Sequence, residues 1–479
     1  RQAWSWEGPT DYTNNQMHQI NRFSWMDDLL FAGLEGNNAC LVKLDGYLRD
    51  WCAHADKHLQ FDTSGRAGPI LDAGIRMKSK VLPITFYSFL SAHEFQDATR
   101  ILMLAAIARH GPYLRHYHRP HGNHKTMELL GLLTLADAFP EFRDRDAYID
   151  YVRLSVSEEH EYSFYVEEGV QKELAQGYHK IVIKDYEEFK TLFAKIGVEP
   201  DPLLDPIIQK GWEHLALTRK PNGYSLMLND ENDASHEKDV ISRAEIYDRP
   251  DWLYPFSNGR EGVEPDKGPS VMYAWSGRMV SRDDWGAFTR WSVFDLGPFG
   301  IGHQHNDKLH LSIFAHGRDL LVDAGRYTYL SYGSRSPIDW RGYFRRSWSH
   351  NVILVDGKSQ NDEVNEVTRP ATDWKIMDEY DFALGSFEKG WDEISGIHQR
   401  AFINIKGKCW LICDLLSLEA SSSIQALWHF HPDCTVPEPQ GSQVMSTDPG
   451  LGNLRIVPVS PEDLQWSVRV VKGQKVPTY

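Results

Sequence analysis

Residues 300–325 read GIGHQHNDKLHLSIFAHGRDLLVDAG and contain the clearest β-hairpin pattern of the chain. Apolar stretches lie on either side of His-Gly-Arg-Asp at 316–319, so the pattern predicts two antiparallel strands joined by a turn there. In an extended chain every second side chain points to the same face. His303, His305 and Asp307 would then lie on one face of the first strand.

Short strands of the same kind are predicted from about residue 270 to the end of the chain. Stretches such as HNVILVDG at 350–357 and AFINIKGKCWLICDLL at 401–416 are rich in β-branched and aromatic residues, and turns with Gly, Asp and Asn separate them. We therefore predict an antiparallel β-sandwich over residues 270–479.

Upstream of this region the apolar residues recur at the spacing of an α-helix. We therefore predict a multidomain α+β fold class. We predict an all-helical domain over 1–222, arranged as a bundle or as a ring of helical hairpins, and a polar linker over 223–269. Gly-Pro at 111–112, Phe-Pro at 139–140 and Glu-Pro at 199–200 predict turns between helices. The predicted helices cover 26–34, 40–51, 75–90, 95–108, 127–138, 181–193 and 203–217.

The composition excludes several classes of protein. With 479 residues, 41% of them hydrophobic and 25% charged, the chain can bury large cores, so a disordered or fibrous protein is excluded. No apolar run is long enough to span a membrane. The net charge of -16 disfavours non-specific binding to nucleic acid or to an anionic membrane, and we expect neither as a partner.

The first ten residues, RQAWSWEGPT, lack the charged start and the apolar stretch of a secretion signal. We expect a periplasmic or secreted protein from which the signal has been removed, with a cytoplasmic location as the alternative. Assembly into a homo-oligomer is left open by the sequence.

Three side chains of the β region form a candidate metal site. The second strand of the hairpin brings Asp323 back towards the histidines, and His350 opens another strand. Two neutral imidazoles and one carboxylate are a known zinc ligand set, which His305, Asp323 and His350 could supply. The alternative is a polar strand end whose histidines face water or cap turns.

A second candidate site is the start of the helix in HRPHGNHKTMELLG. Asn123 and His124 are predicted at the N-cap and at the first helical position, where free backbone N–H groups favour an anion such as a carboxylate. The alternative is an ordinary Asn cap followed by a histidine in solvent.

The third candidate is EEGVQKELAQGYHKIVI, in which Gly169, Gln171 and Glu173 precede Tyr178 and His179 at a helix start. In a basic pocket the pKa of a Tyr hydroxyl can fall far enough for it to exchange protons with a substrate. The alternative is a Tyr-His pair that only packs.

Taken in chain order, Asn123-His124 at a helix start, then Gly169 to His179, then His303-x-His305-x-Asp307 in the β region, the three segments resemble the heparinase II/III family of polysaccharide lyases, which includes heparin, heparan sulfate and alginate lyases. The resemblance covers roughly 70–360 and implies an (α/α) toroid followed by an antiparallel β-sandwich. The helical part is short for a complete toroid, so we expect the toroid to be incomplete or to need helices upstream of Arg1. Many members have Ser-Pro before the Tyr-His where this chain has Ala175-Gln176-Gly177, which changes the loop and its subsite contacts.

The resemblance also implies the reaction, a β-elimination that removes the C5 proton of a uronic acid and expels O4. It implies that Asn123 and His124 neutralise the uronate carboxylate, helped by Arg76. Tyr178 would deliver a proton to O4 and serve as base on the same face, and His303 would be the base for the opposite C5 epimer.

The resemblance further implies a structural zinc that lies beside the cleft and holds loops of the β-domain. His305, Asp323 and His350 match the ligand positions, with calcium or manganese as the alternative ions.

A basic and aromatic segment, RSPIDWRGYFRRSWSH at 335–350, favours an anionic polysaccharide or oligosaccharide as the binding partner. We predict that Arg341, Tyr343 and Arg345 bind it through carboxylate or sulfate contacts and ring stacking. The alternative is a surface loop whose arginines pair with acids of the protein. The segment also contains Arg335, Trp340, Arg346 and Trp348.

Two functions of other classes stay open. A glycoside hydrolase on a helical ring would need two carboxylates about 5 to 10 Å apart. A non-catalytic glycan-binding protein would keep the basic aromatic segment without needing Tyr178. The carboxylates available to a hydrolase are Asp72, Glu128, Glu173 and Asp307.

Overall fold

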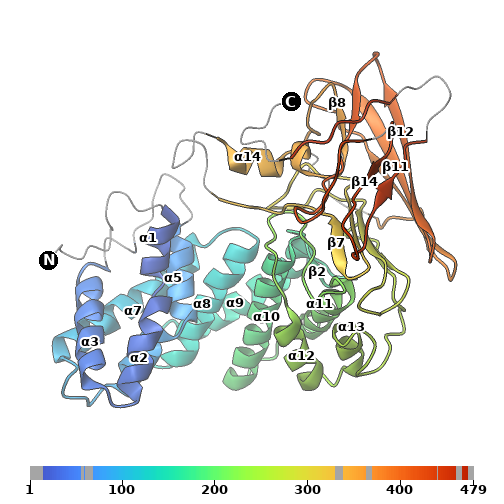
Figure 1. Cartoon of the computed structure of the whole chain (residues 1–479). Coiled ribbons are helices and arrows are strands. Elements are labelled where there is room, and N and C mark those ends of the chain that lie inside the picture. The colour runs from blue at the N-terminus through green and yellow to red at the C-terminus, as the bar shows by residue number, and fades with distance from the viewer. Residues whose placement is uncertain are drawn as a thin grey trace. The chain divides into compact units, whose positions relative to one another are not determined.

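The computed structural model describes residues 14–55, 59, 68–329, 338–362, 369–439, 441–459 and 466–472. The chain forms two compact units, of which the first comprises Arg1–Val166 and Ile181–Ile208 and the second comprises Glu167–Lys180 and Gln209–Tyr479. Figure 1 shows helices in the N-terminal part of the chain and sheets in its C-terminal part. The predicted combination of a helical N-terminal region with C-terminal antiparallel sheets is confirmed, whereas closure into a toroid and the domain boundaries stay predictions.

The helices of the first unit pack on one another, with α5 against α8, α3 against α7, and α8 against both α7 and α9. The following α10 and α11 lie partly in each unit. The helices up to this point are α1 (Asn14–Asn21), α2 (Asp27–Leu34), α3 (Asn38–Ala53), α5 (Gly68–Lys78), α6 (Val81–Ser88), α7 (Asp97–Tyr117), α8 (Asn123–Ala138), α9 (Arg145–Ser163), α10 (Gln176–Ile196) and α11 (Leu204–Thr218).

At two places the division of the chain into helices differs from the sequence prediction. The helix predicted over 75–90 is divided, because Lys80 adopts a left-handed backbone with φ of 63° between α5 and α6. The turn predicted at Gly111 and Pro112 lies inside the continuous helix α7. A Cβ at position 111 would lie 2.7 Å from the hydroxyl of Tyr148, so the glycine lets α9 pack closely at this point.

Helices α5 and α8 approach each other through two glycines. A Cβ at Gly131 would lie 2.5 Å from the carbonyl oxygen of Gly74, and a Cβ at Gly74 would lie 2.7 Å from the Cα of Glu128. Real Cβ atoms do not approach other atoms so closely, so only glycine allows this separation of the two helices. The contact fixes α8, the helix that begins with Asn123.

The second unit contains the antiparallel sheets. One sheet has five strands in the order β3-β4-β5-β6-β7, another has four in the order β12-β11-β10-β9, and β13–β8 and β14–β15 form two-stranded pairs. The strands of the chain are β1 (Phe164–Tyr165), β2 (Val170–Gln171), β3 (Val271–Tyr273), β4 (Arg278–Arg282), β5 (Trp291–Asp295), β6 (Leu311–Ala315), β7 (Arg318–Leu321), β8 (Ile353–Val355), β9 (Trp374–Ile376), β10 (Tyr380–Phe387), β11 (Gly396–Ile405), β12 (Cys409–Leu418), β13 (Ile424–Ala426), β14 (Val444–Met445) and β15 (Arg455–Ile456).

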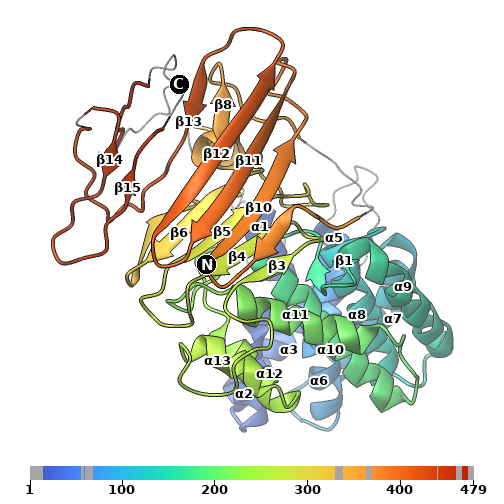
Figure 2. The same cartoon turned by 90° about the vertical axis from the view of Figure 1, so that its right-hand side faces the viewer.

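The two large sheets pack face to face around one apolar core, as Figure 2 shows for β10–β12 and β4–β6. Phe294 on β5 stacks on Phe402 on β11 with 5.6 Å between ring centroids. Polar contacts also join the layers, since Trp410 donates its indole N–H to the hydroxyl of Ser292 at 3.2 Å. This packing is a β-sandwich, as the succession of short strands and turns in the sequence predicted.

The polar segment 223–269 folds back onto the second unit. It contains α12 (Glu237–Ile246) and α13 (Leu253–Phe256), and Leu226 and Leu228 are buried. A third helix of this unit, α14, spans Trp340–Arg345. Among the residues that the structure describes, none of the helices combines the length and the apolar character that crossing a lipid bilayer requires.

Candidate active site

The hairpin of β6 and β7 is present as predicted, with a tight turn at His316 and Gly317, whose φ values are 51° and 85°. The strand begins only at Leu311, however, and the preceding HQHND stretch forms a loop. His303 has a left-handed backbone with φ of 58°, which breaks the alternation expected of an extended chain. The prediction that His303, His305 and Asp307 share one strand face is therefore wrong.

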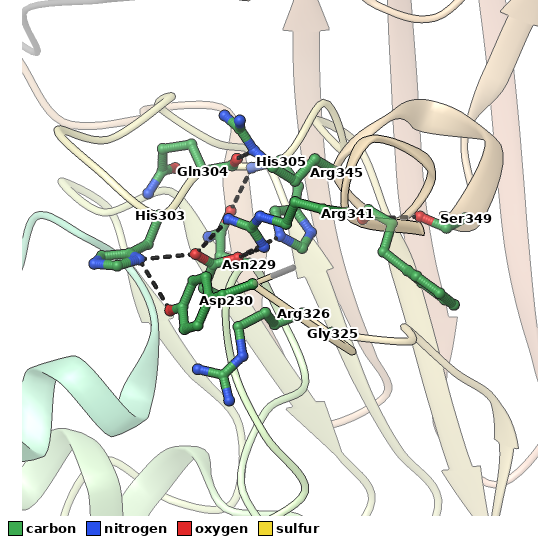
Figure 3. Close-up of polar contacts among 12 residues, drawn as sticks. Asn229, Asp230, His303, Gln304, His305, Gly325, Arg326, Arg341, Arg345 and Ser349 are labelled. Atoms are coloured by element: carbon green, nitrogen blue, oxygen red, sulfur yellow. Dashed lines mark hydrogen bonds and ion pairs between the residues drawn. The ribbon is translucent and has the colours of Figure 1, made fainter. Parts of the chain in front are cut away.

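Asp230 is the centre of the polar cluster in Figure 3. Its carboxylate accepts hydrogen bonds from Nδ1 of His303 at 2.8 Å and from Nε2 of His305 at 3.0 Å. The guanidinium of Arg341 contacts both carboxylate oxygens, and its Nη2 lies 2.7 Å from Oδ2. Burial alone would raise the pKa of Asp230, but these three partners outweigh it and hold the pKa below its usual range.

Tyr178, the third residue of α10, stacks on the imidazole of His303 with 3.7 Å between ring centroids and 15° between planes. Its hydroxyl hydrogen bonds to the hydroxyl of Tyr329, which lies 3.4 Å from Nδ1 of His303. Burial and the bond to Tyr329 raise the pKa of Tyr178 above its ordinary value. The lowering of the pKa that a basic pocket could have produced is therefore absent at Tyr178, and the phenol keeps its proton at neutral pH.

The start of α10 is held by Glu231. The backbone N–H of Gly177 donates to this buried carboxylate, and a Cβ at Gly177 would lie 3.2 Å from its Oε1. Burial raises the pKa of Glu231 to about 7, although Lys180 and Arg326 lower it. The glycine at this position, where the chain departs from the Ser-Pro of many members, therefore makes room for an acid of the neighbouring loop.

The three predicted metal ligands lie together. His305, Asp323 and His350 are all buried, and each offers a ligand atom within 4.8 Å of the others. Nδ1 of His350 contacts the carboxylate of Asp323 at 2.6 Å. Nδ1 of His305 and Nε2 of His350 are buried and have no hydrogen-bond partner in the described part of the chain. Two unpartnered imidazole nitrogens beside a carboxylate fit a metal ion, and the donor set fits zinc.

The pKa shifts of His305 and Asp323 suit a cation, whereas burial would lower the pKa of His350 but Asp323 raises it above its ordinary value. Burial lowers the pKa of His305 to about 4, so its ring is neutral and can offer a lone pair. Burial would raise the pKa of Asp323, but His350 and His310 hold it below its usual value. A deprotonated carboxylate and a neutral imidazole are the forms that bind a metal.

Asn123 and His124 lie in the first unit, at the start of α8. Gly122 occupies the N-cap with φ of 86°, so Asn123 is the first helical residue and the helix begins one residue earlier than predicted. Asn123 is buried and His124 is half-buried. The adjacent turn is anchored by Glu159, which accepts from the backbone N–H of Gly122 at 2.7 Å and pairs with Lys125 at 3.1 Å.

Arg76 is buried among aromatic rings of the first unit. Its guanidinium lies 4.2 Å from the ring centre of Trp51, and it donates to the carbonyl oxygen of Asn21 at 2.7 Å and contacts Nε2 of His110 at 2.9 Å. Burial lowers the pKa of Arg76 to about 10. These contacts are internal, and the predicted role of Arg76 in substrate binding stays a prediction.

The predicted substrate-binding residues of the second unit lie on α14. Arg341 is paired with Asp230, and Arg345 donates from Nε to the carbonyl oxygen of Gln304 at 3.2 Å. Tyr343 packs its ring 5.1 Å from that of Phe344. Their binding of a polysaccharide stays a prediction, and Arg335 lies outside the described residues.

The carboxylates proposed for a hydrolase have different surroundings. In the first unit Asp72 is paired with Arg22 and His18, and Glu128 is fully buried. In the second unit Glu173 lies 3.6 Å from Nε2 of His303. Asp307 is buried, and burial raises its pKa to about 8.

Sequence reasoning missed Asp230, Glu231, Arg326 and Tyr329. The run LNDEND at 228–233 was interpreted as part of a linker because it is polar. The signal that could have drawn attention to it is the pair of leucines at 226 and 228 directly before the acids, since apolar residues that anchor a polar run indicate packing.

Comparison with known proteins relates both regions to one family. The heparinase II/III N-terminus model matches residues 3–248, and the heparinase II/III-like C-terminal model matches residues 283–476. A heparin-sulfate lyase of Bacteroides stercoris is 22% identical over 306 residues, which cover 61% of this chain and 44% of that protein. A heparin-sulfate lyase of Pedobacter heparinus is 21% identical over 429 residues, which cover 88% of this chain and 63% of that protein. The chain thus spans less than two thirds of these curated relatives.

Solved structures show the same fold. The crystal structure of heparan sulfate lyase HepC from Pedobacter heparinus has a TM-score of 0.67 and 20% identity, and the match covers 94% of this chain and 70% of that chain. The crystal structure of heparinase III has a TM-score of 0.79 and 16% identity, and the match covers 94% of this chain and 71% of that chain.

Proposed function

The chain belongs to the heparinase II/III-like family, and from this membership and the cluster around His303 we propose that it is a polysaccharide lyase. The proposed substrate is a uronic-acid-containing glycosaminoglycan of the heparin or heparan sulfate type, because the curated relatives are heparin-sulfate lyases. Alginate is the second substrate to test. A secreted or periplasmic location would suit such a polymer.

The observation that carries the proposal is the stack of Tyr178 on His303. A β-elimination needs a base that accepts the C5 proton and an acid that protonates O4 as the C4–O4 bond breaks. A protonated phenol and an imidazole are groups of these two kinds, and the stack holds them together. The electrons of the C5–H bond become the C4=C5 double bond of the product.

In this assignment Tyr178 donates the proton to O4 and His303 accepts the proton from C5. The raised pKa of Tyr178 supports its role as the acid. For a uronate whose C5 proton faces the phenol, Tyr178 would first have to give up its own proton, and only then could it serve as base and afterwards as acid. Asn123 and His124 would neutralise the uronate carboxylate and stabilise the enolate-like intermediate.

For the metal we propose zinc held by His305, Asp323 and His350. A bound zinc would tie the loop before β6 to the segments after β7 and before β8, and it would add positive charge near an anionic substrate. Calcium and manganese fit less well because two of the three donors are imidazoles.

A substrate panel tests the function directly. The protein is incubated with heparin, heparan sulfate, chondroitin sulfate, hyaluronan and alginate, and both the ultraviolet absorbance of unsaturated uronate and the number of reducing ends are measured. A lyase produces both signals on at least one polymer. Reducing ends without the absorbance would indicate a hydrolase, and binding with neither signal would indicate a glycan-binding protein.

A further inference from the structure

Asp230 lies between the two histidines of the His-Gln-His sequence at 303–305 and accepts a hydrogen bond from each of them. Its Oδ2 accepts from Nδ1 of His303, and its Oδ1 accepts from Nε2 of His305. The carboxylate is fully buried, and Arg341 balances its charge. Since a carboxylate only accepts hydrogen bonds, each ring nitrogen that faces it carries the proton.

This arrangement determines which nitrogen of each ring keeps its lone pair and can accept a proton or bind a metal. In His303 the proton on Nδ1, which is 2.8 Å from Asp230, leaves Nε2 with the lone pair that a base needs, since the carboxylate of Glu173 lies beyond hydrogen-bond distance of Nε2 at 3.6 Å. In His305 the proton on Nε2 leaves Nδ1, the buried nitrogen without a hydrogen-bond partner among the described residues, with the lone pair that a metal needs. One carboxylate thus sets the tautomers of the two rings that Figure 3 shows beside it.

We propose that Asp230 is a positioning residue that orients His303 for proton transfer and His305 for metal binding at the same time. Its role at His303 rests on the proposed lyase function, whereas its role at His305 does not. The metal site and the proton-transfer site are then coupled through a single side chain. In metal sites a carboxylate that holds the second nitrogen of a histidine ligand typically changes the affinity 10–100-fold, about 1.4 to 2.7 kcal/mol.

The loops around Asp230 are held by their own backbone contacts. The N–H of Asp230 donates to the carbonyl oxygen of His303 at 3.1 Å. Asn229, with a left-handed φ of 59°, accepts from the N–H of His305 at 3.0 Å and donates to the carbonyl oxygen of Leu174 at 3.2 Å. A substitution that keeps the size of Asp230 should therefore leave the loops in place and remove only the charged acceptor.

Asp230→Asn is the test, with Asp233→Asn as the matched control. Asp233 is an exposed acid of the same loop, and its Oδ1 lies 3.8 Å from Nζ of Lys220. Zn²⁺ alone is titrated into metal-free full-length protein against a competing chelator, without substrate. We expect Asp230→Asn to weaken Zn²⁺ binding about 10–100-fold and Asp233→Asn to leave it unchanged.

Activity at saturating Zn²⁺ tests the other half of the proposal. If Asp230 orients His303, kcat of Asp230→Asn stays on the order of a hundredfold below the wild type while KM and the melting temperature change little. Equal Zn²⁺ affinity in Asp230→Asn and wild type, or no Zn²⁺ binding by the wild type, overturns the role at His305. Full recovery of kcat at saturating Zn²⁺ overturns the role at His303.

A second variant keeps the test decisive if Asp230→Asn does not fold. Asp230→Glu retains the charge that balances Arg341 but displaces the carboxylate by one methylene, so both Zn²⁺ affinity and kcat should fall. Wild-type values for both would overturn the proposal. A wild-type protein that cleaves none of the polymers refutes the lyase function, and the Zn²⁺ titration still decides the role at His305.

Discussion

The phenol ring of Tyr178 lies almost parallel to the imidazole of His303, with 3.7 Å between their centroids. The two residues come from distant parts of the sequence, a helix start and the loop before a strand. Each ring has a polar partner of its own, since the phenol bonds to Tyr329 and the imidazole to Asp230. The hydroxyl of Tyr329 also lies 3.4 Å from Nδ1 of His303, so Tyr329 is a contact that the proton donor and the proton acceptor share.

Tyr178→Phe should lower kcat on the order of a thousandfold while the protein keeps its fold, because the substitution removes only the acid. The initial rate of unsaturated product formation and the circular dichroism spectrum measure the two effects. Tyr224→Phe, at an exposed tyrosine of the same unit, is the control and should retain wild-type turnover. Wild-type turnover in Tyr178→Phe would remove this residue from the mechanism.

Asn123→Ala should weaken the stabilisation of the intermediate by about 3 kcal/mol, the value expected for one positioned donor. The loss should appear in kcat, because the charge on the substrate carboxylate shifts towards an enolate only during the reaction. Steady-state kinetics on the best polymer of the panel separate kcat from KM. An effect on KM alone would mean that Asn123 binds only the ground-state substrate.

Protein purified without added metal should contain about one equivalent of zinc, and His350→Ala should lose it because the ligand set falls to two. His303→Ala should keep the zinc and lose activity, since its ring contacts Asp230 and is not one of the three clustered donors. Elemental analysis of both variants measures this. The opposite result, with zinc lost from His303→Ala and retained by His350→Ala, would reverse the ligand assignment.

Glu128→Gln should make the protein more stable at alkaline pH. Burial raises the pKa of the Glu128 carboxyl from 4.5 to about 8, although the backbone N–H of Arg119 lowers it. The folded state then binds this proton more tightly than the unfolded state, so the free energy of unfolding falls as pH rises between about 4.5 and 8. The variant lacks this loss and should gain about 2 to 4 kcal/mol over the wild type above pH 8.

Denaturant unfolding of Glu128→Gln and wild type at a series of pH values measures that difference. Glu158→Gln, at an exposed position of α9, is the matched control for the loss of one carboxylate from the helical region. A constant difference between Glu128→Gln and wild type across the pH range would contradict a buried, protonated Glu128.

Gly131→Ala should destabilise the helical region by about 1 to 3 kcal/mol, because the new methyl group would lie 2.5 Å from the carbonyl oxygen of Gly74 and force α5 and α8 apart. Gly46→Ala is the matched control in the interior of α3, where no atom lies within 4 Å of the added Cβ. That substitution should be neutral or stabilising by up to about 1 kcal/mol. Equal melting temperatures of the two variants would contradict the close helix contact.

Local patterns predicted the parts of the fold that local forces determine. Apolar stretches around the turn at 316–319 predicted the β6–β7 hairpin, and the return of the chain through that hairpin correctly grouped Asp323 with His305 and His350. Pro140 and Pro200 lie between helices as predicted. In each of these places the residue type restricts its own backbone or its immediate neighbours.

Tertiary contacts decided the features that the patterns missed. Pro112 lies inside α7, where Tyr148 packs against the neighbouring glycine at a distance that no local rule contains. His303 adopts a left-handed backbone that its sequence neighbours do not require, and its ring is held by Asp230. The pKa of Tyr178 rises because it is buried beside Tyr329, a residue 151 positions away in the sequence.

The run Asn229–Asn232 has the composition at which protein engineers usually join segments of related enzymes. In this chain it contacts three distant stretches, through the bonds of Asn229 and Asp230 to the 303–305 loop, of Glu231 to Gly177, and of Asn232 to Arg326. A chimaera joined within this run would pair the carboxylates of one parent with the imidazoles of another. Parents that differ in this loop should therefore recombine into folded but inactive hybrids, unless residues 226–233 are inherited together with 303–305 and 326.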